Sequence, residues 1–181
     1  MSWKRRAEIR HTTERGTAAG LATLVDAVLR ADGWVTKLSP PGADGGVDIL
    51  GGRGSLGLDD PRLCVQVKSQ NAPADVTVYR TLQGTMQTFK AEQGLLVCGS
   101  GTGMAITANK VHGVRAAVAW SEETARLARE HNDANVLTIG SKFTDEEHAV
   151  ALTDLFLRTE FAGGRHARRV AKIAQLEQPN E

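Results

Sequence analysis

The pattern of the sequence changes near Gly94, and this change constrains the fold more than any other feature. Before Gly94, short extended segments are separated by the glycine-rich stretches PPGADGG and GGRGSLG, as expected of an antiparallel meander. After it, the short apolar segments GLLVC, VRAAVAW and NVLTI alternate with helical segments, which is typical of strands buried on both faces of a parallel sheet. We therefore expect a three-layer α/β domain with a mixed sheet, whose antiparallel N-terminal half continues into parallel, Rossmann-like βα units. The expected parts are residues 1–93 and 94–181, joined in one continuous sheet.

Apolar periodicity gives the expected elements. One helix carries the stripe Leu21, Leu24, Val25, Val28 and Leu29 and ends at Gly33, and another, entered at Asp75, carries Tyr79, Leu82, Met86 and Phe89. Three extended segments lie between them, at residues 34–38, 47–50 and 63–68. A capping box of Thr144 and Glu147 predicts the start of a later helix. The last helix is expected over the basic segment Arg165–Leu176.

Composition excludes several classes of protein. With 41% apolar and 24% charged residues, the chain is expected to be globular rather than disordered. No apolar run approaches the roughly 18 residues of a membrane span, so no membrane partner is expected. Two cysteines, Cys64 and Cys98, are too few for a disulfide framework, which favours a cytoplasmic location. The net charge of +1 neither indicates nor excludes nucleic acid, and the two basic clusters are expected to be solvated faces: Lys4, Arg5, Arg6 and Arg10, and Arg165, Arg168, Arg169 and Lys172.

Three polar residues of the N-terminal half form a first candidate site. In RLCVQVKS, Gln66 and Lys68 alternate with apolar residues and so share one face of a strand. If the strand that holds Asp48 pairs beside it, an acid, an amide oxygen and an amine meet at a sheet edge. Asp48 and Gln66 would then bind Mg²⁺, which takes oxygen ligands and activates a bound water, and Lys68 would stabilise the negative charge of phosphodiester hydrolysis. Spacing alone favours a half-buried strand with a polar outer face.

The surrounding residues resemble a known family. The stretches ADGWVTKLSPPGADGGVDIL, LCVQVKS and DVTVYRTLQGTMQTFKAEQGLLV are similar to the Mrr-type restriction endonucleases of the PD-(D/E)xK superfamily, over about residues 15–97. The resemblance implies a Mg²⁺-dependent endonuclease that acts on DNA, with Asp48, Gln66 and Lys68 as its catalytic residues. Gln66 stands where many members have glutamate, so weaker metal binding is expected. The rest of such a domain has no match after this segment.

The segment CGSGTGM supplies a second candidate site. It places a thiol at the end of a buried strand, followed by glycines whose N–H groups can turn toward an anion at the start of a helix. A thiolate at Cys98 can remove a proton from a carbon next to a carbonyl group. Taken alone, such a cysteine is more often a buried structural residue.

A second resemblance covers about residues 94–176. GLLVCGSGTGMAITANKVHGVRAAVAW, ARLAREHNDANVLTIG and FLRTEFAGGRHARRVAKI closely resemble ribose-5-phosphate isomerase B and its galactose-6-phosphate isomerase relatives. The resemblance implies a cofactor-free aldose–ketose isomerase that converts ribose 5-phosphate to ribulose 5-phosphate, in a site shared across a homodimer interface. The implied roles are Cys98 as the base with Ser100 beside it, the amides of Gly99, Gly101 and Gly103 around the enediolate, His131 for ring opening, Asn132 for sugar binding, and Arg165 and Arg169 for the phosphate.

Two features of the isomerase family have no match in this sequence. They are an aspartate-histidine-alanine-glycine loop and a tyrosine-proline-aspartate segment. We therefore expect a hybrid chain. The Mg²⁺-dependent endonuclease is the main expectation, because its three residues lie in one block. The isomerase is the alternative, with phosphate binding but little turnover, and an inactive hybrid that binds phosphate-bearing ligands is the third possibility.

Overall fold

The computed structural model describes residues 18–31, 33–40, 47–67 and 76–177. By its internal contacts the chain divides into two compact units, the first unit Met1–Gly94 and the second unit Leu95–Glu181. Lys68, Asp75 and the N-terminal basic cluster lie outside the described residues. The expectations for them therefore stay predictions.

The first unit contains an antiparallel meander between two helices. Its described elements are α2 (Ala18–Ala31), β1 (Val35–Leu38), β2 (Ile49–Arg53), β3 (Asp59–Val67) and α3 (Val76–Phe89). β1, β2 and β3 pair antiparallel in that order, and the register shifts between Gly51 and Arg53. The predicted meander is thus confirmed, although β3 begins at Asp59 rather than Leu63.

The core of the first unit lies around β3. Every residue from Leu63 to Val67 is buried, and Ile49 of β2 is completely covered. α2 and α3 both contact β3, which explains how a strand with alternating polar residues loses its solvent-facing side. The expectation of a half-buried strand with a polar outer face is therefore wrong: Gln66 is only 5% exposed. Burial also raises the pKa of the Cys64 thiol to about 12.

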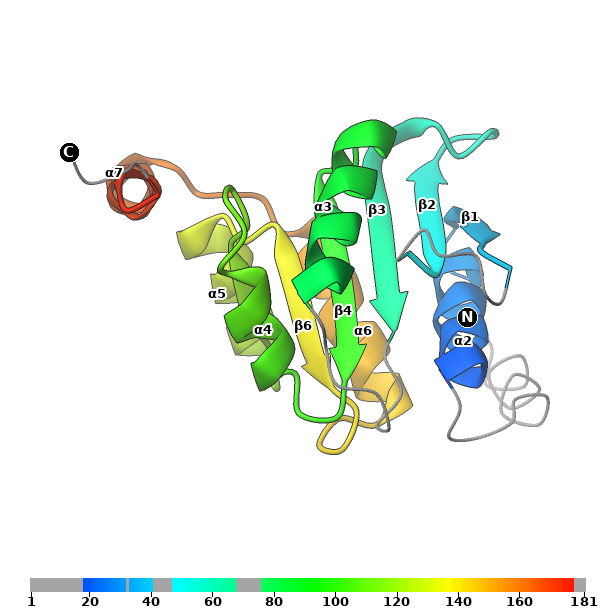
Figure 1. Ribbon diagram of the computed structural model, residues 1–181. Coiled ribbons are helices and arrows are strands. Elements are labelled where there is room, and N and C mark those ends of the chain that lie inside the picture. Colours follow the sequence, from blue (N-terminus) through cyan, green and yellow to red (C-terminus); the bar gives the residue numbers. More distant parts are fainter. Residues whose placement is uncertain (1–17, 32, 41–46, 68–75, 178–181) are drawn as a thin grey trace. The chain divides into compact units, whose positions relative to one another are not determined.

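The second unit contains alternating strands and helices. Its elements are β4 (Gln93–Cys98), which begins at the end of the first unit, α4 (Thr102–Ala108), β5 (Ala116–Val118), α5 (Glu122–Asn132), β6 (Val136–Gly140), α6 (Glu146–Arg158) and α7 (Gly164–Gln175). The strands lie in the order β4, β6, β5; β5 and β6 pair in parallel, and the arrows of β4 and β6 point the same way in Figure 1.

Helices cover both faces of these parallel strands. α4 contacts β5 and β6 on the near face in Figure 1, whereas α5 and α6 pack against each other behind the strands. The apolar core between the layers includes Leu96, Leu137, Leu152 and Phe156, each at most 1% exposed. The predicted class is confirmed: the chain has a three-layer α/β fold, antiparallel in its first half and parallel in its second.

The start of α6 differs from the prediction. The helix begins at Glu146, and its N-cap is Asp145, whose carboxylate accepts the N–H of His148 at 2.9 Å. The expected capping box of Thr144 and Glu147 is wrong: the cap is Asp145, and Thr144 is buried just before the helix. The negative charge of Asp145 also suits the positive end of the helix dipole.

α7 is the most exposed helix of the second unit. It packs against α5, and His166 is its one buried residue. The predicted basic helix is thus confirmed, beginning at Gly164. None of the described helices is long and apolar enough to cross a membrane.

Candidate active site

Cys98 ends β4 and begins a tightly held loop. Its sulfur accepts the N–H of Gly101 at 3.2 Å, and the side chain is half-buried. The loop is tied to the end of β6, because Ser141 donates its N–H to the Cys98 carbonyl at 2.8 Å and Lys142 donates to the Gly99 carbonyl at 3.1 Å. The thiol therefore lies at the fixed end of a strand, where its sulfur accepts a hydrogen bond from a backbone N–H group.

Gly101 makes this loop possible. It lies in the left-handed region, with φ of 76°, and precedes α4. A Cβ atom there would lie 3.1 Å from the nitrogen of Gly140 and 3.2 Å from the carbonyl carbon of Ile139. The loop can thus approach the β6 backbone only with glycine at this position. By contrast, a Cβ at Gly103 would meet nothing within 4 Å.

An open hollow of about 430 Å³ lies beside the loop at the carboxyl ends of the strands. Ser100 and Thr102 line it from the loop, and two largely exposed aromatic side chains, Trp120 and Phe143, line it from beyond β5 and β6. Sequence reasoning did not identify these aromatic residues. The sequence signal for them is that each closely follows a short apolar strand.

The other predicted isomerase residues gather at the end of α5 and the start of α7. The imidazoles of His131 and His166 stack with their centroids 4.1 Å apart and their planes 11° apart. Arg165 donates from Nε to His166 Nε2 at 3.3 Å. Asn132 is exposed and donates to the Leu127 carbonyl of its own helix at 3.2 Å. His166, which sequence reasoning did not identify, is thus central to this cluster.

His166 is 7% exposed in a setting that opposes its protonation. Burial, followed by the neighbouring His131, Arg165 and Arg169, lowers the pKa of His166 below its ordinary 6.5, while Glu130 acts in the opposite direction. The cluster therefore places a buried imidazole beside the guanidinium groups of Arg165 and Arg169. Such a surface can accept an anion.

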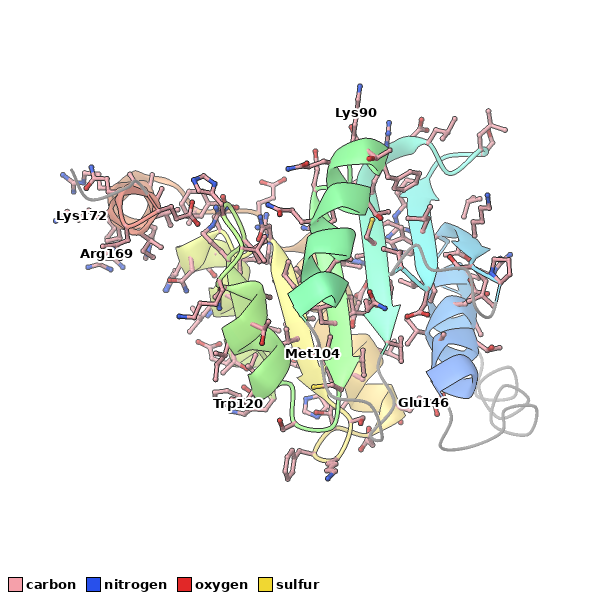
Figure 2. All side chains as sticks on the ribbon, in the orientation of Figure 1. Lys90, Met104, Trp120, Glu146, Arg169 and Lys172 are labelled. Carbon is pink, nitrogen blue, oxygen red and sulfur yellow. The ribbon has the colours of Figure 1, made fainter. Side chains whose placement is uncertain are left out.

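Within one chain, the two groups of predicted isomerase residues lie at opposite ends of the parallel strands. Cys98 follows the carboxyl end of β4, whereas α5 runs back along the strands and ends at His131, near their amino ends. Figure 2 shows the same separation: Trp120 lies at the arrowhead end, and Arg169 and Lys172 lie on α7 toward the other end. The structure thus brings Cys98, Gly99, Ser100, Gly101 and Gly103 together and His131, Arg165 and Arg169 together, but not the two groups.

Two of the three predicted nuclease residues, Asp48 and Gln66, lie among the described residues of the first unit. The Asp48 carboxylate accepts the N–H of Val67 at 2.6 Å, and the Asp48 N–H donates to the Val65 carbonyl at 2.8 Å. Gln66 lies between Val65 and Val67 on β3. Its side chain is buried, and its Oε1 atom has no hydrogen-bond partner. One carboxylate engaged by the backbone and one buried neutral amide are a poor ligand set for Mg²⁺, which usually keeps several waters. Among the described residues, no three His, Cys, Asp or Glu side chains are grouped to hold a metal.

Comparison with known proteins bears on both sites. Residues 74–173 match the ribose/galactose isomerase family, and residues 14–118 match a restriction endonuclease family. A probable ribose-5-phosphate isomerase B of Mycoplasma genitalium is 48% identical over 88 residues, which are 49% of this chain and 58% of that protein. Ribose-5-phosphate isomerase B of Escherichia coli is 43% identical over 89 residues, 49% of this chain and 60% of that protein.

The solved structures agree with these relatives. Ribose-5-phosphate isomerase B of Mycoplasma genitalium, solved with bound ribulose-5-phosphate, superposes with a TM-score of 0.56 at 36% identity and covers 62% of this chain and 75% of its own. The enzyme of Clostridium thermocellum gives a TM-score of 0.55 at 40% identity and covers 59% and 73%.

These findings correct the main expectation. The relatives and structures above are isomerases, so the Mg²⁺-dependent endonuclease, with DNA as its partner, is not supported. The chain spans less than two thirds of the length of the two curated relatives. By these matches the chain belongs to the ribose/galactose isomerase family, and over residues 14–118 also to the restriction endonuclease family.

Proposed function

We propose that the chain is a sugar-phosphate isomerase that interconverts ribose 5-phosphate and ribulose 5-phosphate. The observation that carries this proposal is the Cys98 loop, a thiol at a strand end with the Gly101 N–H on its sulfur. The ribulose-5-phosphate bound to the Mycoplasma genitalium enzyme supports the choice of substrate. The reaction needs no cofactor, because a base and hydrogen-bond donors suffice to move a proton between adjacent carbons.

Each half of the reaction has its own residues. Cys98, as the thiolate, takes the proton from C2 of the open-chain aldose and returns it to C1, while the hydroxyl proton of O2 passes to O1 with Ser100 assisting beside it. The charge that develops on the substrate oxygens is held by the amides of Gly99, Gly101 and Gly103. His131 moves the proton that opens the sugar ring, and Asn132 binds the opened chain. Arg165 and Arg169 bind the phosphate, for which guanidinium groups are well suited.

The active form is a homodimer in this proposal. Cys98 and His131 belong to opposite ends of the same three strands, so one copy cannot offer both to one sugar phosphate. A second copy supplies the missing group. The exposed position of α7 supports this, since Arg165 and Arg169 lie on its surface.

We further infer a hybrid chain, in which a restriction-endonuclease-like first half replaces the first part of an isomerase. The absent aspartate-histidine-alanine-glycine loop and tyrosine-proline-aspartate segment would contact the ring and the phosphate. Each lost charged contact costs about 1.5–3 kcal/mol. Two such losses slow turnover by roughly two to four powers of ten, at about 1.4 kcal/mol per factor of ten. Slow isomerisation with retained phosphate affinity is therefore expected.

The test follows ribulose 5-phosphate formation from ribose 5-phosphate by the purified chain. Wild type should produce ketose above the uncatalysed rate, and Cys98→Ala should abolish the production. Ser55→Ala, in an exposed turn of the first unit, serves as the control and should leave the rate unchanged. Ketose formation that survives in Cys98→Ala, or none in wild type, would refute the proposal.

A further inference from the structure

The residue that ends α5 has an unusual backbone conformation. Asp133 is the C-cap of the helix, with φ of 47° and ψ of 42°, in the left-handed region. Glycine adopts this region most readily, and asparagine and aspartate follow it. Glycine would suffice if the residue only had to end the helix. Aspartate adds a carboxylate, which makes contacts of its own.

Both carboxylate oxygens of Asp133 are bound by guanidinium groups. Oδ2 lies 2.7 Å from an Nη atom of Arg115, and Oδ1 lies 2.8 Å from an Nη atom of Arg129. Arg115 also donates from Nε to the Asp133 carbonyl at 2.8 Å, and Arg129 donates to the Ala134 carbonyl at 2.8 Å. The Arg129 side chain is only 14% exposed, so water competes weakly for this set of charge-assisted hydrogen bonds.

The two arginines connect Asp133 to separate parts of the second unit. Arg115 directly precedes β5, and its backbone is bound to Asn135 in both directions, at 2.8 and 3.1 Å. Arg129 donates to the Thr159 carbonyl at 3.4 Å, in the segment between α6 and α7. The same segment donates from the Ala162 N–H to the Glu130 carbonyl at 3.0 Å. The last turn of α5 is thereby fixed to the start of β5 and to the chain that leads into α7.

His131 lies within this fixed turn. Its ring stacks on His166 of α7 at 4.1 Å, and Arg165, directly before His166 on the same helix, donates to the His166 ring. We propose that Asp133 is a positioning residue: by binding Arg115 and Arg129, it fixes the last turn of α5 and so sets the placement of His131 against α7. The structural part stands on these contacts alone, whereas its consequence for ring opening rests on the proposed isomerase function.

Two variants separate the carboxylate from the backbone conformation. Asp133→Asn keeps the size and the tolerance for the left-handed region but removes the charge, and Asp133→Gly keeps only the tolerance. Glu123→Gln is the control, because it removes an exposed carboxylate that pairs with Arg126 at 2.9 Å on the same helix. Far-UV circular dichroism checks that each variant folds. If Asp133→Gly does not fold, the test rests on Asp133→Asn.

The first readout is independent of activity. Stacked imidazoles shield each other's ring protons, so two of the five histidines should give upfield-shifted proton NMR signals in wild type and in Glu123→Gln. Asp133→Asn and Asp133→Gly should lose this shift. Unchanged upfield signals in folded Asp133→Asn would overturn the proposal, whatever the activity of the chain.

The second readout compares two substrates. Ribose 5-phosphate must open its ring, whereas a four-carbon aldose 4-phosphate cannot close one. Asp133→Asn should lower kcat/KM for ribose 5-phosphate by roughly tenfold to 10²-fold, as misplaced catalytic groups do, with a clearly smaller loss for the four-carbon substrate. Equal losses for both substrates would reduce Asp133 to a general structural role and overturn the positioning claim. If wild type converts neither substrate, the proposed function fails, and the NMR readout alone decides on Asp133.

Discussion

The Asp48–Gln66 region of the first unit and the Cys98 loop of the second both place polar side chains at the end of a strand, but they use them differently. The Asp48 carboxylate accepts a backbone N–H of β3, and Gln66 is only 5% exposed. Cys98 ends β4, and Ser100 and Thr102, which follow it, line an open hollow. The comparison shows that the spacing of a motif is not enough to make a site. The groups must also be accessible and not already bound by the backbone.

The largest expected effect on stability comes from a substitution in the loop after Cys98. Gly101→Ala should lower the free energy of unfolding by about 1–3 kcal/mol, because alanine resists a φ of 76° and its Cβ would press on the β6 backbone. Chemical denaturation followed by circular dichroism measures this change. Gly103→Ala is the matched control: it has free space within α4 and should be neutral or slightly stabilising. Equal effects of the two substitutions would contradict the tight loop.

A smaller effect is expected in the first unit. Gln66→Met should leave the free energy of unfolding unchanged or raise it by about 1 kcal/mol, because Oε1 is buried without a partner in wild type. Mg²⁺ should not change the melting temperature of either protein, and supercoiled plasmid incubated with the chain and Mg²⁺ should stay intact. If Mg²⁺ raised the melting temperature of wild type but not of Gln66→Met, Gln66 would be a metal ligand after all.

The smallest effect is a pH dependence at the other end of the second unit. Above about pH 6.5, His166 is neutral in both the folded and unfolded states. Because its folded pKa is lowered, the unfolded state takes up the proton first as the pH falls below 6.5, and the free energy of unfolding decreases. Thermal unfolding between about pH 8 and pH 5.5 measures how the free energy of unfolding changes with pH. His166→Gln should reduce this pH dependence. An equal pH dependence in both proteins would show that the buried imidazole is not its source.

Much of the fold could be predicted because it depends on local pattern. The strand at GLLVC, the helix that contains Leu82 and Phe89, and the basic helix at the end of the chain all follow from periodicity or composition over a few residues. The start of α6 was less predictable, since Thr144 and Asp145 are both good caps; in the structure Asp145 caps the helix and Thr144 is buried. Burial of that kind depends on packing from distant elements.

The candidate site was harder to predict for the same reason. The sequence identifies Cys98 and the glycines after it, because their chemistry is local. It does not reveal that helices would bury Gln66, or that His131 would stack on His166 more than thirty residues away along the chain. The Arg115–Asp133–Arg129 contacts likewise join the residue before β5, a residue of α5 and the residue that ends α5. Long-range packing therefore decides which of the predicted polar groups are available for chemistry.

Proton exchange tests the central claim, that Cys98 is the base of a sugar-phosphate isomerase, most directly. Ribose 5-phosphate is incubated with the chain in heavy water, and the C2 proton signal is followed by NMR. Our account predicts that wild type replaces this proton with deuterium, because the thiolate exchanges with solvent between abstraction and return, and that Cys98→Ala and Cys98→Ser do so at no more than the uncatalysed rate. Exchange at the wild-type rate in Cys98→Ala, or no exchange in wild type, would contradict it.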